Sequence, residues 1–237
     1  MKILALEASA TAASAAVCTE DRVIGEYFLD TAQTHSQTLL PMVEQLLAAT
    51  QIPLEALDFL AVSTGPGSFT GLRIAISAVK GMAMGAQKPC VGVSTLEALA
   101  YNLRGFDGII VPAMDARCGQ VYTALFTFEG DTLRRLAPDE AISVQELGKM
   151  LSDFQKPLFL VGDGAELCYN ILLESLPLLR LAPPHLRRQR AASVAAAAVH
   201  RYGEQGAVDC ALLLPGYLRL PQAERELLQR QQDGKTE

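Results

Sequence analysis

The segment Thr64–Gly71, which reads Thr-Gly-Pro-Gly-Ser-Phe-Thr-Gly, constrains the fold more than any other part of the sequence. It follows the apolar run 57–63, which predicts a buried strand, and precedes residues 72–84, where apolar side chains recur at helical spacing. A glycine-rich turn is therefore expected to join a strand directly to a helix. Strand, turn and helix recur in this order along the chain, which is typical of an α/β fold.

The same turn is a candidate anion site. Amide groups in the first turn of a helix have no acceptor within that helix, and glycines let a ligand approach the backbone closely. The segment lacks the Gly-Lys-Ser/Thr ending of a P-loop, so phosphate binding and simple packing both remain open. The candidates for a residual nucleotide or phosphate cradle are Gly65, Gly67, Ser68, Gly71 and Glu7.

Carboxylates end an apolar strand in each half of the chain. Glu7 follows the first strand, and Asp115 follows residues 109–114. In a cleft between two lobes such carboxylates could meet a hydrated magnesium ion, and the alternative is a capped strand end. Arg73 stands in the first turn of a helix, where a cation opposes the helix dipole, so we expect a carboxylate or a ligand beside it.

The two halves of the sequence follow a similar plan, which suggests an internal duplication. In the first half, the expected strands are 2–8, 15–19, 23–29, 57–63 and 90–93, and the expected helices are 36–49, 72–84 and 95–103. In the second half, the expected strands are 109–114, 121–128, 132–135 and 158–161, and the expected helices are 144–151, 165–173 and 193–202. Ser193 is the expected N-cap of the last helix and Gly203 its stop signal.

The domain organisation follows from these elements. Residues 1–104 form a first lobe, and residues 105–190 form a second lobe that begins at a connector rich in glycine and charge. We expect the segment 191–220 to pack back on the first lobe. Residues 222–237 are a polar tail, which we expect to fray.

Charge and cysteine usage exclude several functional classes. The formal net charge of −6 argues against tight binding to nucleic acid or to an anionic membrane without a partner. The five cysteines form no Cys-x-x-Cys pair and the three histidines no His-x-x-x-His pair, so we expect reduced thiols and no transition-metal site. Glu7 interrupts the N-terminal apolar run and no window resembles a membrane span, so we expect a cytoplasmic protein.

Small side chains form a stripe along the second predicted helix. Ile74, Ala78, Gly81 and Gly85 follow one another at spacings of four, three and four residues. Because glycine inside a helix costs about 1 kcal/mol relative to alanine, this flat face is expected to pack against another helix. The sequence leaves open whether that helix belongs to this chain or to another.

Several motifs spread along the chain resemble the TsaB family, also called YeaZ. They are residues 3–9, 35–37, 64–73, 92–99, 114–117 and 215–219. The resemblance implies an actin-like ATPase (ASKHA) fold, with two lobes of duplicated mixed sheets flanked by helices. It also implies a role in placing threonylcarbamoyl on adenosine 37 of tRNAs that read codons starting with A.

The resemblance further implies that the chain is an accessory subunit and not an enzyme. The catalytic relative, TsaD, holds its metal with a His-x-x-x-His pair, and this chain has Thr95 and Leu99 at the corresponding positions. Neither side chain can replace imidazole as a ligand. We therefore expect no catalytic residue, no metal site, and no cofactor beyond weak or vestigial nucleotide binding.

The family resemblance also predicts the partners. The helices 36–49 and 72–84 are expected to contact TsaD and, in its absence, to form a homodimer. The ATPase TsaE is expected to join the complex, tRNA to be reached only through it, and no membrane to be involved. The residues assigned to the partner interface are His35, Leu39, Val43, Arg73, Ile74, Ala78, Gly81 and Gly85.

The alternative function is an ATP-dependent small-molecule kinase of the actin-like superfamily. Residues 65–71 together with Glu7 and Asp115 could then be working parts of a nucleotide cleft.

Overall fold

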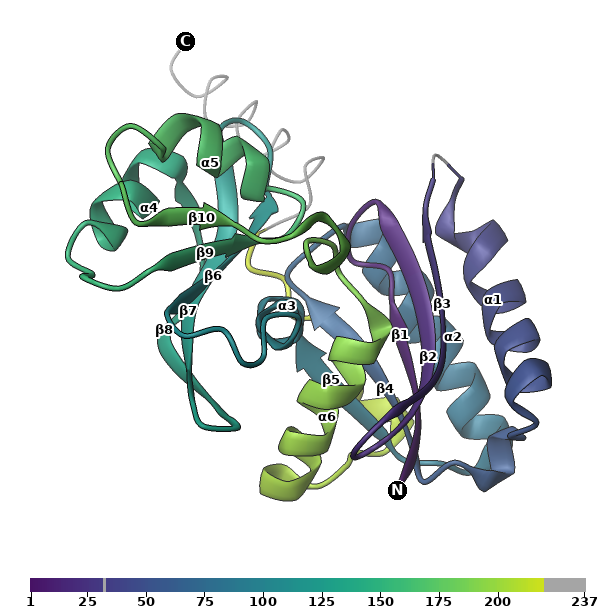
Figure 1. Ribbon diagram of the computed structural model, residues 1–237. Helices are drawn as coiled ribbons and strands as arrows, with labels where there is room; N and C mark the ends of the chain where they lie inside the picture. The colour runs from purple at the N-terminus through teal and green to yellow at the C-terminus, as the bar shows by residue number, and fades with distance from the viewer. Residues whose placement is uncertain (32, 220–237) are drawn as a thin grey trace, which may run out of the picture.

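A computed structural model describes residues 1–31 and 33–219, which form two lobes built around one five-stranded mixed sheet each (Figure 1). The first sheet has the strand order β3-β2-β1-β4-β5. Its strands are β1 (Lys2–Glu7), β2 (Ala12–Thr19), β3 (Val23–Asp30), β4 (Phe59–Gly65) and β5 (Cys90–Ser94). The helices around it are α1 (His35–Thr50), α2 (Phe69–Ala86), α3 (Thr95–Tyr101) and α6 (Ala191–Gln205).

The second sheet repeats the topology of the first. Its strands are β6 (Ile109–Asp115), β7 (Gln120–Glu129), β8 (Thr132–Ser143), β9 (Leu158–Val161) and β10 (Leu179–Leu181), in the order β10-β9-β6-β7-β8. Two helices, α4 (Val144–Leu151) and α5 (Ala165–Leu172), complete the lobe. In both sheets an antiparallel meander is extended by two parallel strands, which confirms the predicted duplication of mixed sheets.

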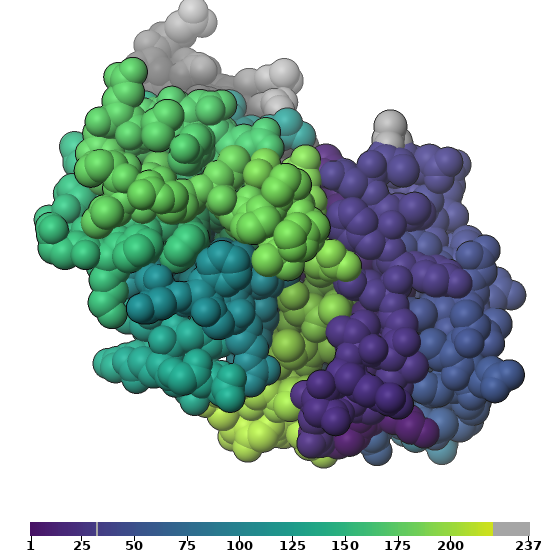
Figure 2. All heavy atoms as spheres, in the orientation of Figure 1, coloured from purple at the N-terminus to yellow at the C-terminus, as the bar shows by residue number. Residues whose placement is uncertain are grey.

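The two faces of the first sheet carry separate cores because side chains alternate along a strand. On β1, Leu4 and Leu6 face α1 and α2, whereas Ile3 and Ala5 face α6. All four side chains are fully buried. The sheet is therefore covered on both sides, and α6, which follows the second lobe in sequence, supplies one of the two layers. Figure 2 shows α6 at the surface between the two lobes.

The second sheet is covered in the same way, and α3 lies between the lobes. One face packs against α4 and α5, and the other packs against Leu96, Leu99 and Leu103 on and after α3. The first turn of α3 is capped by Ser94, which is the last residue of β5 in the first sheet. The helix thus joins the two halves of the molecule through its own core contacts.

Several element boundaries differ from the predictions. The third strand of the second lobe runs on from the predicted 132–135 to Ser143, and the short strand β10 was not predicted. The last helix begins at Ala191, with Arg190 and not Ser193 at the N-cap position, and continues through Gly203 to Gln205. Ser193 therefore lies inside the first turn and not at the cap, and its hydroxyl donates to the side chain of Asn102.

Within the described residues, no helix is long and apolar enough to cross a membrane. All five cysteines are free thiols; three are buried, Cys210 is half-buried and Cys118 is exposed. Short 3-10 turns, Leu54–Ala56, Pro184–Leu186 and Cys210–Leu212, connect the main elements. The predicted polar tail, residues 222–237, lies outside the described residues.

Candidate functional site

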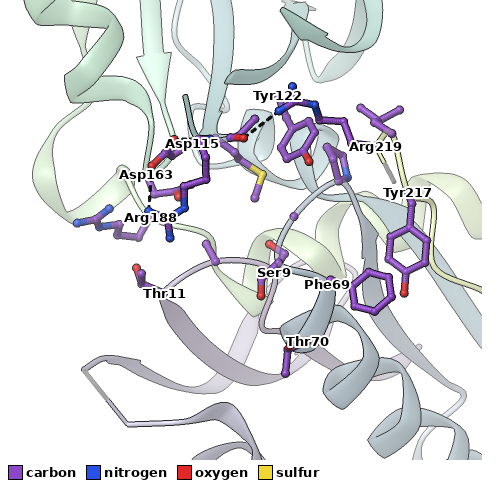
Figure 3. A pocket seen from close by; sticks show the side chains of 18 residues that line it. Ser9, Thr11, Phe69, Thr70, Asp115, Tyr122, Asp163, Arg188, Tyr217 and Arg219 are labelled. Atoms are coloured by element: carbon purple, nitrogen blue, oxygen red, sulfur yellow. Dashed lines mark hydrogen bonds and ion pairs between the residues drawn. The ribbon is translucent and has the colours of Figure 1, made fainter. Parts of the chain in front are cut away.

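A pocket of about 590 Å³ opens between the two lobes (Figure 3). The first lobe contributes the turn after β1 and the turn before α2, and the second lobe contributes the ends of β6 and β9. The C-terminal segment forms a further wall. The polar and aromatic lining residues are Ser9, Thr11, Ser68, Phe69, Thr70, Asp115, Arg117, Tyr122, Asp163, Arg188, Tyr217 and Arg219.

The first-lobe wall is the start of α2. The Ser68 hydroxyl caps the helix by accepting from the amide of Gly71, at 3.3 Å, and the Ser68 amide donates to the carbonyl of Ser9, at 2.6 Å. The amides of Phe69 and Thr70 belong to the first turn, where a helix offers no acceptor. Both residues line the pocket. Within the described part of the chain neither amide has an acceptor, and the positive end of the helix dipole lies at this wall.

Ser9 adds a hydroxyl to this wall. The residue is 1% exposed, and its Oγ makes no hydrogen bond of good geometry among the described residues, although it lies close enough to the Glu7 carboxylate to help lower the pKa of that group. Burying a hydroxyl without a hydrogen-bond partner costs free energy, and native proteins rarely leave such a group unpaired. Ser9 also lines the pocket.

Two glycines of the predicted cradle are required by packing. A Cβ atom on Gly67, which has φ of +156°, would lie 2.5 Å from the carbonyl oxygen of Ser9. A Cβ atom on Gly71 would lie 1.9 Å from the carbonyl oxygen of Ala8. Both contacts would force the backbone apart, so these glycines let α2 approach the turn after β1. Of the predicted cradle, Gly67 and Ser68 line the pocket, whereas Gly65 and Gly71 are buried beside it.

The second-lobe wall carries two carboxylates. Asp115 accepts from the amide of Arg117 at 2.8 Å and forms an ion pair with its guanidinium at 3.6 Å. Asp163 accepts from the side-chain amide of Gln189 at 2.6 Å. Burial raises the pKa of Asp163, so its ionised form is disfavoured there.

The C-terminal segment 215–219 spans from one lobe to the other. The Gly216 amide donates to the Thr64 carbonyl at 2.7 Å, and Tyr217 stacks on Phe69 with ring centroids 4.6 Å apart. Arg219 then donates to the carbonyl of Ala116 in the second lobe, at 2.9 Å, and to the side chain of Gln120. No carboxylate among the described residues pairs with Arg219, although it lines the pocket.

Glu7 does not line the pocket, which fits the alternative of a capped strand end; that Glu7 or Asp115 meets a hydrated magnesium ion stays a prediction. Glu7 is 1% exposed and lies between β1 and β4, where the Ser63 hydroxyl and the Ser9 amide donate to its carboxylate. Burial raises the pKa of Glu7, and these hydrogen bonds partly oppose that shift. Within the described part of the chain, no group of three or more His, Cys, Asp or Glu side chains could hold a metal ion.

The residues assigned to a partner interface fall into two groups. Leu39 and Val43 are buried in the core beneath α1, so their assignment to an interface is corrected: their side chains are already occupied by the first sheet. Gly81 and Gly85 face open space, since a Cβ atom at either position would meet nothing within 4 Å.

The other four residues assigned to the partner interface all contact other parts of this chain. Ile74 and Ala78 are half-buried against the same core. His35 donates from Nε2 to the carbonyl of Ala10 at 2.7 Å. Arg73 has no carboxylate partner among the described residues; its guanidinium lies 3.8 Å above the Phe69 ring, and its Nε donates to the Tyr217 hydroxyl at 3.0 Å. The Phe69 ring and the Tyr217 hydroxyl are thus the partners of Arg73, where a carboxylate or a ligand was expected.

The sequence analysis missed some residues of the interlobe pocket and some exposed apolar residues near the predicted partner interface. Leu40 and Met84 are 51% and 71% exposed on α1 and α2, which are neighbours in the fold. They were missed because exposure depends on how each helix is rotated against the sheet. Asp163 lies in a Gly-Asp-Gly turn between a strand and a helix. The similarity of this turn to the glycine-rich turn at 64–71 was the sequence signal that could have marked Asp163 as a candidate site residue.

Comparisons with known proteins match the chain to a TsaD family model and to TsaB proteins, both named for threonylcarbamoyl modification of tRNA. The family model described as TsaD, tRNA N6-adenosine threonylcarbamoyltransferase, matches residues 29–226. A tRNA threonylcarbamoyladenosine biosynthesis protein TsaB from Bacillus subtilis is 33% identical over 234 residues, which cover 98% of this chain and 100% of that protein.

Solved structures support the same grouping. YeaZ from Pseudomonas aeruginosa is similar with a TM-score of 0.76 and 28% identity, over 92% of this chain and 99% of that one. Component A of the (R)-2-hydroxyglutaryl-CoA dehydratase from Acidaminococcus fermentans has a TM-score of 0.51 at 10% identity, over 86% of this chain and 98% of that one, and shows the fold alone. Together with the duplicated sheets, these similarities confirm the predicted actin-like ATPase fold.

Proposed function

Because the chain belongs to the TsaB family of tRNA threonylcarbamoyladenosine biosynthesis proteins, we propose that it is a non-catalytic subunit that binds and activates TsaD. TsaD is the catalytic metalloenzyme that transfers threonylcarbamoyl to tRNA. In this proposal the chain supplies no reacting group. Its contribution is a surface that holds TsaD in an active conformation.

The observation that carries the proposal is the open face shared by α1 and α2. On α2, the exposed Met84 stands one helical turn from the bare backbone at Gly81 and next to Gly85, and on the neighbouring α1 the side chain of Leu40 is exposed as well. A flat stripe of small residues lets a second helix approach at about 8 Å between axes, and exposed apolar side chains beside it gain by being covered. The face therefore fits an amphipathic helix of a partner.

The positions corresponding to the TsaD metal ligands support an accessory role. Thr95 and Leu99 are 0% and 1% exposed, respectively. Leu99 packs into the core between α3 and the second sheet, and neither side chain can ligate a metal as imidazole does. In the complex, TsaD would then supply the groups that catalyse the reaction.

The remaining partners follow from the same proposal. The ATPase TsaE would join the complex, tRNA would be reached through TsaD, and the free chain would form a homodimer through the open face. The working compartment would be the cytoplasm. The alternative, a small-molecule kinase, has less support because Glu7 is buried away from the interlobe pocket.

Reconstitution tests the proposal. The purified chain is mixed with TsaD and analysed by size-exclusion chromatography with light scattering. In parallel, threonylcarbamoyl transfer to tRNA is measured with and without the chain. We expect a stable heterodimer and a transfer rate that depends on it. Separate elution of the two proteins, together with full transfer by TsaD and TsaE alone, would contradict the proposal.

A further inference from the structure

Strand β5 is the last strand of the first sheet, and part of its outer edge is open (Figure 1). In the parallel ladder with β4, the Leu60 amide donates to the Pro89 carbonyl, so Cys90 points its own amide and carbonyl away from β4. Gly92, two residues further along the strand, points the same way. Cys90 exchanges two hydrogen bonds of 2.8 Å with Val208. In the described part of the chain, the amide and the carbonyl of Gly92 have no partner.

Gly92 lines a second pocket, of about 240 Å³, between β5, the end of α6 and residues 206–214. This volume is smaller than the roughly 300–1,000 Å³ of sites that enclose a whole small-molecule ligand. Leu212 and Leu214 form part of its wall and are 69% and 68% exposed, so the apolar surface extends beyond the pocket. The site therefore suits the end of a chain, with one residue inside and the preceding residues across the two leucines.

The charge of this second pocket is positive. Of the described residues that line it, Arg201 alone is charged. Arg201 is half-buried on α6, and Glu204, the nearest carboxylate along the sequence, lies instead beside His200 at 3.7 Å. A carboxylate bound here would form a charge-assisted hydrogen bond with Arg201 without displacing another partner.

The position of Val208 determines which end of a chain fits. A strand added antiparallel to β5 would pair with Gly92 and then run toward Cys90, where Val208 already occupies the pairing position. The chain itself does not reach Gly92, because Gly206 ends α6 and donates its amide to the Tyr202 carbonyl at 2.9 Å. An added strand must therefore end opposite Gly92, and in this direction its last residue carries a carboxylate.

We propose that this pocket binds the free C-terminus of a protein chain that ends in an apolar residue. The amide of that last residue donates to the Gly92 carbonyl, and one carboxylate oxygen accepts from the Gly92 amide. The other carboxylate oxygen pairs with Arg201, and the apolar side chains pack against Leu212 and Leu214. Strand addition and capture of a terminal carboxylate are both recurring modes of peptide recognition. The pocket shares no lining residue with the interlobe pocket, so it is a separate site.

Peptide binding to the isolated full-length chain tests this inference. The probe is the acetylated tetrapeptide Ala-Thr-Val-Leu with a free carboxylate, titrated by calorimetry and followed at the amide NMR signal of Gly92. We expect saturable binding with a Kd below about 1 mM and a shift of that signal. Amidation of the C-terminus removes the charge that faces Arg201, and N-methylation of the last residue removes the donor to Gly92. Each change should weaken binding at least tenfold.

Variants of the chain identify the contacts. Arg201→Gln should bind the free peptide at least tenfold more weakly but the amidated peptide as the original chain does, because both changes remove the same ion pair. Leu214→Ser should weaken binding at least threefold. Arg22→Gln and Leu136→Ser change an exposed arginine and an exposed leucine outside the pocket, and neither should alter the affinity. None of these side chains is buried, so the thermal midpoints should change little.

The inference fails if the free peptide does not bind up to about 5 mM, or if the amidated peptide binds as tightly. It also fails if the same peptide ending in serine binds equally well. Acetyl-leucine should bind at least fivefold more weakly than the tetrapeptide, and equal binding would contradict the proposal by indicating a small-molecule site. None of these measurements involves TsaD, so their outcome is independent of the proposed function.

Discussion

Glu7 and Asp115 occupy corresponding strand ends, yet their surroundings give them different properties. Glu7 is enclosed between β1 and β4 and bonded to Ser63 and Ser9, whereas Asp115 reaches the interlobe pocket and pairs with Arg117. Burial raises the pKa of Glu7 from its ordinary value of 4.5. The same type of side chain therefore stabilises the first sheet in one lobe and lines a pocket in the other.

The raised pKa of Glu7 predicts a pH dependence of stability. The folded protein binds this proton more tightly than the unfolded chain, so the stabilisation is fully present below pH 4.5 and is lost as the pH rises through the raised folded value. Glu7→Gln keeps a neutral group there and should make the free energy of unfolding depend less on pH above pH 4.5. Urea denaturation at a series of pH values measures this effect.

Two further variants control the experiment. Glu44→Gln changes an exposed carboxylate on α1 and should leave the pH profile as it is. Asp163→Asn should reduce the slope in the same direction as Glu7→Gln, because burial also raises the pKa of Asp163. Identical slopes for the original protein and Glu7→Gln would show that Glu7 is ionised in the folded state.

Helix α2 performs two tasks on opposite faces. One face, which includes Leu72, Ile76 and Val79, is buried against the first sheet, and the other carries Gly81 and Gly85. Its first turn also forms a wall of the interlobe pocket. A single element thus carries the proposed partner surface and one wall of the interlobe pocket.

Gly81→Leu separates association from folding at this helix. A leucine here would meet no atom of the free chain within 4 Å of its Cβ, and its better helix propensity favours the monomer. The same side chain would block a helix docked on the stripe. We expect self-association and TsaD binding to weaken more than tenfold, or about 1.4 kcal/mol, with little change in thermal midpoint. Sedimentation and calorimetry provide both values.

Gly203→Leu is the matched control for this change. Gly203 also lies on a helix, α6, and a Cβ atom there would likewise meet nothing within 4 Å. This variant should bind TsaD as the original chain does. Normal TsaD binding by Gly81→Leu would exclude the stripe as the contact surface.

Contacts between the lobes come from several directions. Leu99 on α3 packs against the second sheet, Ser94 at the end of β5 donates to Asp139 on β8 at 2.6 Å, and Arg135 pairs with Glu97 at 3.2 Å. On the other side, the segment 215–219 links α2 to the second lobe. The lobes are thus connected by apolar packing as well as by polar contacts.

This shared core predicts cooperative unfolding of the whole molecule. Leu99→Ala leaves a cavity between α3 and the second sheet and should cost about 2–5 kcal/mol. Because α3 also packs on α6 of the first lobe, the loss should lower one common calorimetric transition. Two transitions, of which only one moves, would show that the lobes unfold separately.

The sequence alone determined the local structure. Apolar periodicity placed most strands and helices, and the glycine-rich turn at 64–71 marked the junction of β4 and α2 correctly, because these features depend on residues close together in the chain. The repeated plan of the two halves predicted the duplicated sheets for the same reason. Strand β10, with three residues, was too short to give such a signal.

Only the tertiary structure decided which side chains are available to other molecules. Leu39 and Leu40 are neighbours in one predicted helix, yet the first is fully buried and the second is 51% exposed, because the sheet covers one side of α1. Likewise, Ser9, Asp163 and Arg219 meet at one pocket although they lie far apart in the sequence. The burial of a side chain and its proximity to distant residues arise from packing between segments that are far apart in the sequence. They therefore cannot be predicted from a local pattern of residues.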